Sequence, residues 1–146
     1  MKAGNDFEIM PYVGIGKIRF GMTKEEVRAT LGVPFESFLK SESSELPTDA
    51  FDSLSIHVYY KLPGVCEAIE FGDFGENPTF KGYKFMGKPY KMVEDWLKNL
   101  DPDCYKDNTG LTTMKFGFSL FSPGLTTNLN VPVKGVIVFE KGYYDN

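Results

Sequence analysis

The residues with the clearest chemical potential are the only histidine, His57, and the cysteine Cys66. Alternating apolar residues predict strands over 54–60 and 65–71, and an antiparallel hairpin of the two places the imidazole diagonal to the thiol on one face. A thiol beside an imidazole could form a nucleophile pair. Because no third orienting group or oxyanion site is evident, the sequence favours the alternative, a histidine and a small residue on a partly exposed sheet face.

Pairs of carboxylates are the second chemical candidate. Glu67 and Glu70 are three residues apart on one strand, so they point to opposite faces and cannot act together as an acid and a base. Two further pairs could bind a cation, but the spacing of a calcium loop is missing, and solvated acidic loops are the favoured interpretation. These pairs are Asp49 with Asp52 and Asp73 with Glu76. The chain is therefore not predicted to be an enzyme, and neither a metal nor a cofactor is expected.

Negative charge is concentrated in one segment of the chain. The 146 residues carry a net charge of −4, with a pI near 5.0, which argues against a general nucleic-acid-binding protein. Residues 36–76 contain nine acids and two lysines, for a net charge of −7. Since so few cations lie nearby in the sequence, this segment indicates complementarity to a basic partner.

A short helix is predicted near the N-terminus. Thr23 and Glu26 have the spacing of a capping box, so the helix begins at Thr23, and Gly32 followed by Pro34 ends it. A strand over 16–22 precedes this helix. The hairpin follows it, in a register that pairs Tyr60 with Val65, Val58 with Glu67, Ile56 with Ile69 and Leu54 with Phe71.

The same order of elements recurs in the second half. A strand over 83–85 is followed by a helix with Pro89 at its first position and by two strands, over 111–121 and 133–139. The predicted fold is a single α+β domain over residues 1–146. It is a tandem duplication of a strand-helix-strand-strand unit, and the repeats, about 14–72 and 80–142, form one antiparallel sheet with helices on one face.

No targeting or membrane segment is evident. Asp6 and Glu8 interrupt the region where a signal peptide needs an apolar core, so a cytoplasmic protein without a membrane partner is expected. Both cysteines, Cys66 and Cys104, are expected to be free thiols.

The segment GIGKIRFGMTKEEVRATLG, residues 14–32, resembles the strand–turn–helix opening of outer-membrane assembly lipoproteins and of the beta-lactamase inhibitory protein type, which is a tandem of such units. The whole chain also resembles the small acidic immunity proteins of bacterial polymorphic and contact-dependent toxin systems. That resemblance implies binding and inactivation of a cognate toxin, frequently a nuclease.

The sequence therefore predicts an inhibitor that blocks the active site of a basic toxin through an acidic surface, with no nucleic-acid partner. The predicted partner-binding residues are the acids and aromatics of the acidic segment: Glu42, Glu45, Asp49, Phe51, Asp52, Tyr59, Glu70, Asp73 and Glu76. The alternative is a small-ligand or scaffold-binding domain that uses the sheet face of Ser55, His57 and Tyr59 and an exposed flap over 122–132. The oligomeric state stays open.

Overall fold

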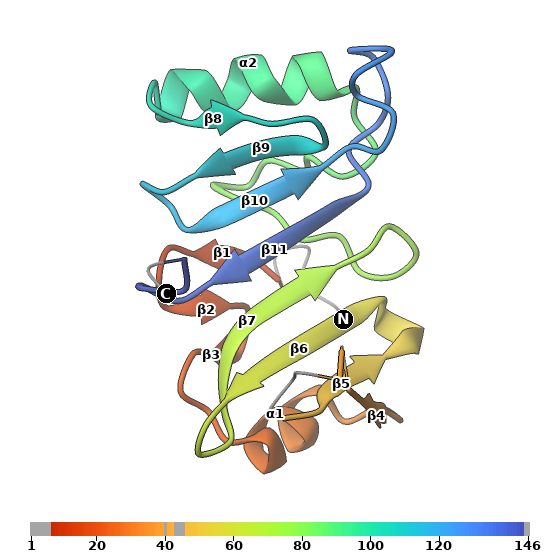
Figure 1. Ribbon diagram of the computed structural model, residues 1–146, viewed down its shortest axis with the longest axis vertical. Coiled ribbons are helices and arrows are strands. Elements are labelled where there is room, and N and C mark those ends of the chain that lie inside the picture. Colours follow the sequence, from red (N-terminus) through yellow and green to blue (C-terminus); the bar gives the residue numbers. More distant parts are fainter. Residues whose placement is uncertain (1–6, 40, 43–45, 145–146) are drawn as a thin grey trace.

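One long antiparallel sheet organises the molecule (Figure 1). The computed structural model describes residues 7–39, 41–42 and 46–144. Eight strands are hydrogen-bonded in the order β4-β5-β6-β7-β11-β10-β9-β8, so β7 and β11 meet in the middle. The strands of the first half are β4 (Glu36–Phe38), β5 (Thr48–Phe51), β6 (Ile56–Lys61) and β7 (Val65–Phe71). Those of the second half are β8 (Tyr105–Lys106), β9 (Gly110–Thr113), β10 (Phe118–Phe121) and β11 (Gly135–Phe139).

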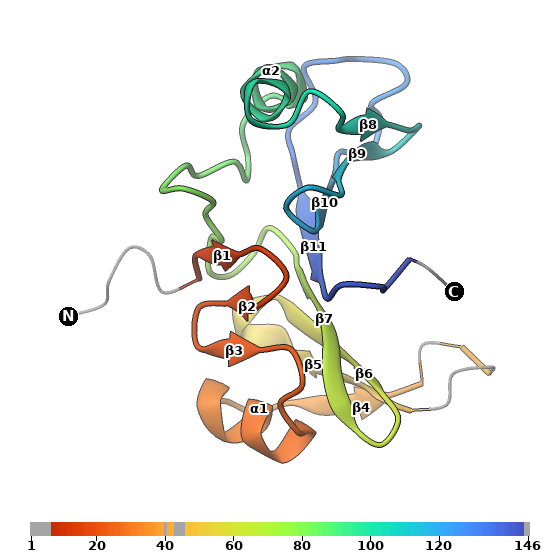
Figure 2. The same ribbon diagram turned by 90° about the vertical axis from the view of Figure 1, so that its left-hand side faces the viewer.

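Both helices cover the same face of this sheet (Figure 2). Helix α1 (Lys24–Leu31) lies against the first half and α2 (Tyr90–Leu100) against the second. A small antiparallel sheet of three two-residue strands lies between them on that side. Its strands are β1 (Ile9–Met10), β2 (Gly14–Ile15) and β3 (Ile18–Arg19). The predicted α+β domain, with an antiparallel sheet and helices on one face, is thus present.

The main core lies between the long sheet and this helical layer. One continuous cluster of buried side chains includes Val27 of α1, Ile56 of β6, Leu97 of α2 and Phe118 of β10, so both halves share it. Burial of apolar surface in this cluster is the chief force that holds the halves together. In the described part of the chain, no helix is long and apolar enough to cross a membrane.

Helix α1 forms as its sequence predicts. The Thr23 hydroxyl accepts a hydrogen bond from the Glu26 amide at 3.1 Å, and the Glu26 carboxylate accepts one from the Thr23 amide at 2.9 Å. This capping box satisfies two amides that the helix itself cannot pair. Gly32 then ends the helix in the left-handed conformation, with φ of 63°.

The strands of the predicted repeat unit need correction. The acidic loop contains β4 and β5, which a polar sequence did not indicate, and residues 111–121 form two strands joined by a turn at 114–117 instead of one. Residues 83–85 form only an isolated bridge at Tyr83, and Pro89 precedes the first residue of α2. Each half is therefore a helix followed by four strands of the long sheet.

The predicted register of the hairpin formed by β6 and β7 is also wrong, by two residues over most of its length. Ile56 pairs with Phe71 and Val58 with Ile69. Between Tyr59 and Tyr60 the register shifts, which leaves one extra residue in β7. Such a bulge reverses the side of the sheet on which the residues beyond it lie.

Candidate binding face of the long sheet

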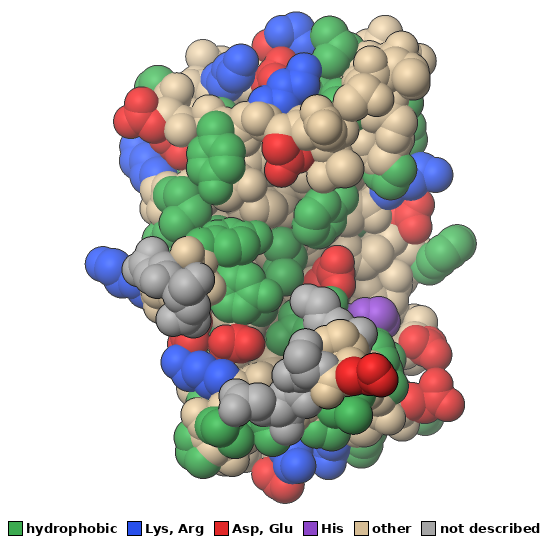
Figure 3. Space-filling model, in the orientation of Figure 1, with side chains coloured by type: hydrophobic (Ala, Val, Ile, Leu, Met, Phe, Trp, Pro, Cys, Tyr) green, Lys and Arg blue, Asp and Glu red, His purple; other side chains and the backbone are tan. Residues whose placement is uncertain are grey.

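The face of the long sheet opposite the helices is open and carries aromatic side chains (Figure 3). A second, smaller cluster of buried residues, Ala68, Ile137 and Phe139, lies there and belongs to β7 and β11. The chain after β11 turns back over it, so the Tyr143 and Tyr144 rings pack on Phe139 with centroid distances of 5.6 and 4.9 Å. The aromatic side chains at this cluster are Tyr12, Tyr59, Phe121, Phe139, Tyr143 and Tyr144.

A hollow of about 640 Å³ adjoins this aromatic cluster, and we call it the acidic hollow. Three of its lining residues are the carboxylates Asp52, Glu70 and Asp73. Parts of the chain that are far apart in sequence meet in its wall: the turn η1 (Asp52–Leu54), strands β6 and β7, the turn after β7, and the start of β11. The other non-glycine residues that line it are Ser55, His57, Phe71, Phe74, Phe121, Pro123 and Lys134.

Glu70 is the polar centre of this region. It accepts a short hydrogen bond from the Tyr59 hydroxyl, and the His57 Nδ1 lies 3.9 Å from its carboxylate oxygen. Burial of Tyr59, together with this bond to a carboxylate, raises the pKa of the phenol. The phenol therefore stays neutral at physiological pH. It donates its hydrogen bond to Glu70 and so orients the Glu70 carboxylate.

The turn after β7 is fixed against the neighbouring η1 turn. The Gly72 amide donates to the Ser55 carbonyl at 2.8 Å, and a Cβ on Gly75 would lie only 2.1 Å from the Leu54 carbonyl oxygen. Only glycine allows this close approach. The turn thereby holds Phe74, whose side chain is 93% exposed, at the hollow.

Four of the predicted binding residues lie in or beside the acidic hollow. Asp52, Glu70 and Asp73 line it, and Tyr59 bonds to Glu70. Glu42 is exposed in the described stretch 41–42, which lies between β4 and β5 in the sequence. Glu45 lies outside the described residues. The acidic segment therefore contributes a localised group of carboxylates to this face.

Two predicted binding residues are buried, and their assignment to a binding surface is wrong. The side chain of Phe51 is fully buried in the main core, and only 1% of Asp49 is exposed. Both belong to β5, which the sequence analysis treated as loop. Neither side chain can reach a partner from this position.

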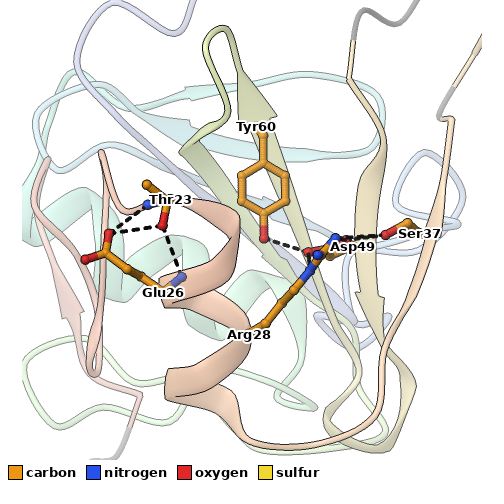
Figure 4. Close-up of polar contacts among 6 residues, drawn as sticks. All are labelled: Thr23, Glu26, Arg28, Ser37, Asp49 and Tyr60. Carbon is orange, nitrogen blue, oxygen red and sulfur yellow. Dashed lines mark hydrogen bonds and ion pairs between the residues drawn. The ribbon is translucent and has the colours of Figure 1, made fainter.

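Asp49 is neutralised inside the protein (Figure 4). Its carboxylate accepts hydrogen bonds from Arg28 Nε and Nη2, at 2.8 and 2.9 Å, and from the Ser37 and Tyr60 hydroxyls, at 2.6 and 2.8 Å. Burial alone raises the pKa of Asp49, but these bonds outweigh it and hold the pKa below its ordinary value. The inference that the acids of this segment need an external cation is wrong for Asp49, because Arg28 of α1 pairs with it.

Glu76 belongs to a different surface. It lines a groove of about 510 Å³ on the helix side, together with Phe7, Lys17 and Leu31. Residues of β1, β3 and α1 line this groove but not the acidic hollow, so Glu76 and Glu70 belong to two different cavities. Grouping it with Asp73 was therefore a consequence of sequence proximity alone.

The thiol–imidazole pair is also contradicted. The bulge in β7 places Cys66 opposite Tyr60 on the core side, whereas His57 lies in the acidic hollow on the open face. Burial raises the pKa of the Cys66 thiol to about 12. A buried neutral thiol is not a nucleophile at physiological pH. Among the described residues, no group of three or more His, Cys, Asp or Glu side chains could hold a metal ion.

Of the residues that the second half contributes, only Pro123 lies in a segment that the sequence singled out, the 122–132 flap of the alternative function. Phe121 and Lys134 were not predicted. All three follow the acidic segment by 45 residues or more and join the hollow only because β11 pairs with β7. Phe74 was accessible to sequence reasoning as an aromatic residue within a charged, glycine-rich turn.

The fold and this face define an α+β protein with a one-sided antiparallel sheet and an aromatic, carboxylate-lined open surface. A comparison of the chain with protein-family models, curated proteins and solved structures gave no significant match.

Proposed function

We propose that this protein is an immunity-type inhibitor that binds a basic protein toxin on the open face of its long sheet. The observation that carries the proposal is the exposed juxtaposition of aromatic rings with Asp52, Glu70 and Asp73. Aromatic side chains dominate the energetics of protein interfaces, and carboxylates complement a basic partner.

The charges of this face are arranged to act on another molecule. Within the described residues, Asp52 and Asp73 make no ion pair, and Lys134 is the only lysine that lines the hollow. Unpaired carboxylates that share one wall repel one another, so a bound cation relieves that repulsion. Opposite charge on a partner also increases the rate of encounter.

A toxin that acts on nucleic acid would fit this surface through its own substrate groove. Such a groove is lined with cations because it must neutralise phosphates. An acidic face that enters it competes directly with the substrate, which is how we propose inhibition occurs.

The mirrored order of the strands supports an internal duplication. The connections between β5 and β6 and between β9 and β10 each contain four residues, and the two pairs of strands begin 62 residues apart. Val27 and Leu31 of α1 correspond to Val93 and Leu97 of α2. Val27, Val93 and Leu97 are buried in the main core, and the partly buried Leu31 packs against it. We infer that two copies of a helix and four strands joined edge to edge at β7 and β11.

The experiment is co-expression with the product of the adjacent reading frame. Cells that express this product should cease to grow and should recover when the wild-type protein is present. The double variant Asp52→Lys/Asp73→Lys should slow association with the purified product at least tenfold at 50 mM salt, and much less at 500 mM. Its thermal midpoint should equal that of the wild type.

The matched control is Asp103→Lys, which reverses an exposed acid in the turn after α2. It should leave association unchanged. An unaltered affinity of the double variant at low salt would contradict the acidic-face proposal and would move the interface to residues 122–132.

A second candidate is the binding of a small ligand. The acidic hollow contains Ser55 and His57 together with Pro123 of the 122–132 segment, as that alternative requires. Native mass spectrometry of the purified protein tests it: a bound small molecule should be present in the wild type and lost in His57→Trp, which fills the hollow.

A further inference from the structure

We infer that the acidic hollow is a receptor for one arginine side chain of the protein partner. This inference rests on the proposed function and assigns the part of the face that would carry specificity. Three features support it: the residues in the hollow's walls, an occupied arginine site elsewhere in the protein, and the exposed Phe74 on a turn whose backbone is fixed.

The walls combine the two groups that a guanidinium binds. Asp52, Glu70 and Asp73 supply carboxylate oxygens, and Phe74 and Phe121 supply aromatic rings. A planar guanidinium can donate hydrogen bonds to carboxylates from its edge and stack an aromatic ring on its face at the same time. An ammonium group has no comparable planar face, so the combination favours arginine over lysine.

The protein contains an occupied site of this composition. The guanidinium of Arg28 donates two hydrogen bonds to Asp49 and lies 4.2 Å from the centroid of the Phe35 ring. That site is filled from within the chain. The acidic hollow offers carboxylates and rings as well, but no arginine of the described chain lines it.

Phe74 is positioned for an external ligand. The residue is 93% exposed although its turn is fixed against η1 by the Gly72 hydrogen bond and the close approach of Gly75. Covering a large solvent-exposed apolar side chain lowers the free energy, because apolar surface is removed from water. A guanidinium that covers it would also lie in the hollow that Asp52, Glu70 and Asp73 line.

Glu70 is held ready for a bidentate contact. The Tyr59 hydroxyl bonds to one of its oxygens, Oε1, which limits the rotation of the carboxylate. Lys134 is the competing cation in this wall, and it makes no ion pair with the described residues. An incoming guanidinium is therefore attracted by more negative than positive charge.

Binding can be measured by NMR through the only histidine, His57. The imidazole of His57 lines the hollow and gives proton NMR signals that no other residue can contribute. The probes are the peptides acetyl-Gly-Gly-Arg-Gly-Gly-amide, its lysine analogue and its citrulline analogue. Citrulline has nearly the shape of arginine but no charge.

The expected result is a saturable shift of the His57 signals with the arginine peptide. The lysine peptide should bind at least threefold more weakly, and the citrulline peptide should give no saturable shift. Glu70→Gln, which keeps an oxygen for Tyr59, and Phe74→Ala should each weaken binding of the arginine peptide at least fivefold. Asp73→Asn is a second test of the charge, on an exposed turn whose fold does not depend on that side chain.

Matched controls are Asp103→Asn for the loss of an exposed charge and Leu129→Ala for the loss of an exposed apolar side chain. Both should bind the arginine peptide as the wild type does. Equal shifts with arginine and citrulline, or no saturable shift with arginine, would overturn the inference. If the toxin still binds and its affinity is unchanged in Glu70→Gln and Phe74→Ala, the hollow is not the arginine receptor, although the proposed function stands.

Discussion

The two halves of the long sheet have the same arrangement of elements, but polar and charged side chains are used differently in each. Each half places one helix over four strands, and the halves meet at β7 and β11. In the first half an ion pair ties the helix to the sheet through Arg28 and Asp49. In the second half the position in β9 that corresponds to Asp49 is Leu111, which is buried and apolar. The shared fold therefore does not need the ion pair.

The helix starts differ in a similar way. Helix α1 is capped by its own Thr23 and Glu26, whereas Pro89 before α2 provides no side-chain cap. Instead, the amides of Tyr90 and Lys91 donate to the carbonyls of Val131 and Leu129, at 2.8 and 3.0 Å. The 122–132 segment was expected to be an exposed flap, and although most of it is exposed, its end is fixed by these bonds. The same requirement for partners at a helix start is met locally in one half and by a distant segment in the other.

The largest expected effect comes from breaking the ion pair of the first half. Asp49→Ala leaves the Arg28 guanidinium and the Tyr60 hydroxyl without their acceptor and should lower the free energy of unfolding by about 3 kcal/mol. The double variant Arg28→Met/Asp49→Leu, which imitates the apolar second half, leaves no unpaired guanidinium and only the Tyr60 hydroxyl without its acceptor, so it should lose about 1–2 kcal/mol less than Asp49→Ala. Urea unfolding followed by the fluorescence of the single tryptophan, Trp96, measures both.

Asp103→Ala, which removes an exposed carboxylate, is the control and should leave the unfolding midpoint unchanged. Equal destabilisation of the single and the double variant would mean that the halves differ in more than this pair.

The pH dependence of the same pair gives the next effect. Because the folded-state pKa of Asp49 lies below its ordinary value near 3.8, the stabilisation is present above that value and is lost as the pH falls through the folded-state pKa. The difference in unfolding free energy between the wild type and Asp49→Asn should be constant from pH 7 to about 5 and should shrink below about pH 4. A difference that already shrinks between pH 7 and 5 would contradict this assignment.

A smaller effect is expected at the start of α1. Thr23→Ala removes the acceptor for the Glu26 amide and should cost about 1 kcal/mol of unfolding free energy. Thr30→Ala, the same chemical change at an exposed position inside the helix, should be neutral or should stabilise by about 0.5 kcal/mol. Chemical denaturation of both variants checks the difference. Equal effects would show that the cap does not fix this helix start.

The smallest expected effect is a difference in labelling rate between the two thiols of the native protein. Cys66 is fully buried in the central strand β7, whereas Cys104 is 9% exposed and adjoins the two-residue edge strand β8. Local opening at the edge should expose Cys104 first, so a disulfide reagent should label it at least tenfold faster than Cys66 in native conditions, which corresponds to about 1.4 kcal/mol. Equal rates would indicate that both halves open only by global unfolding.

Local patterns in the sequence predicted the elements whose signals involve neighbouring residues. The capping box of Thr23 and Glu26, the end of the first helix at Gly32 and the inward-facing Ile56 and Val58 are confirmed. The strands β4 and β5 were missed because their residues include acids and a serine that are typical of loops. Asp49 is acceptable in a buried strand only because Arg28 reaches it from the helix.

The candidate site could be predicted only in part. The concentration of acids in 36–76 indicated the region, and Asp52, Glu70 and Asp73 do share one hollow. Asp49, Phe51 and Glu76 were predicted as binding residues for their charge or aromatic character alone. These properties do not indicate on which side of a sheet a residue lies. Asp49 and Phe51 are excluded from the candidate site by burial, and Glu76 because it lines a different cavity.

By itself the sequence determined the class of fold, the first helix and the acidic character of one segment. These properties depend on composition, on apolar periodicity and on contacts within four residues along the chain. The tertiary structure alone decided which carboxylates face solvent and which are neutralised. It also decided that a bulge turns Cys66 into the core, and that Phe121 and Lys134 join residues of the first half. Those outcomes depend on the pairing of β7 with β11 and on the packing of α1 over β5. No local pattern encodes either contact, because each balances burial and charge between residues that are distant in the chain.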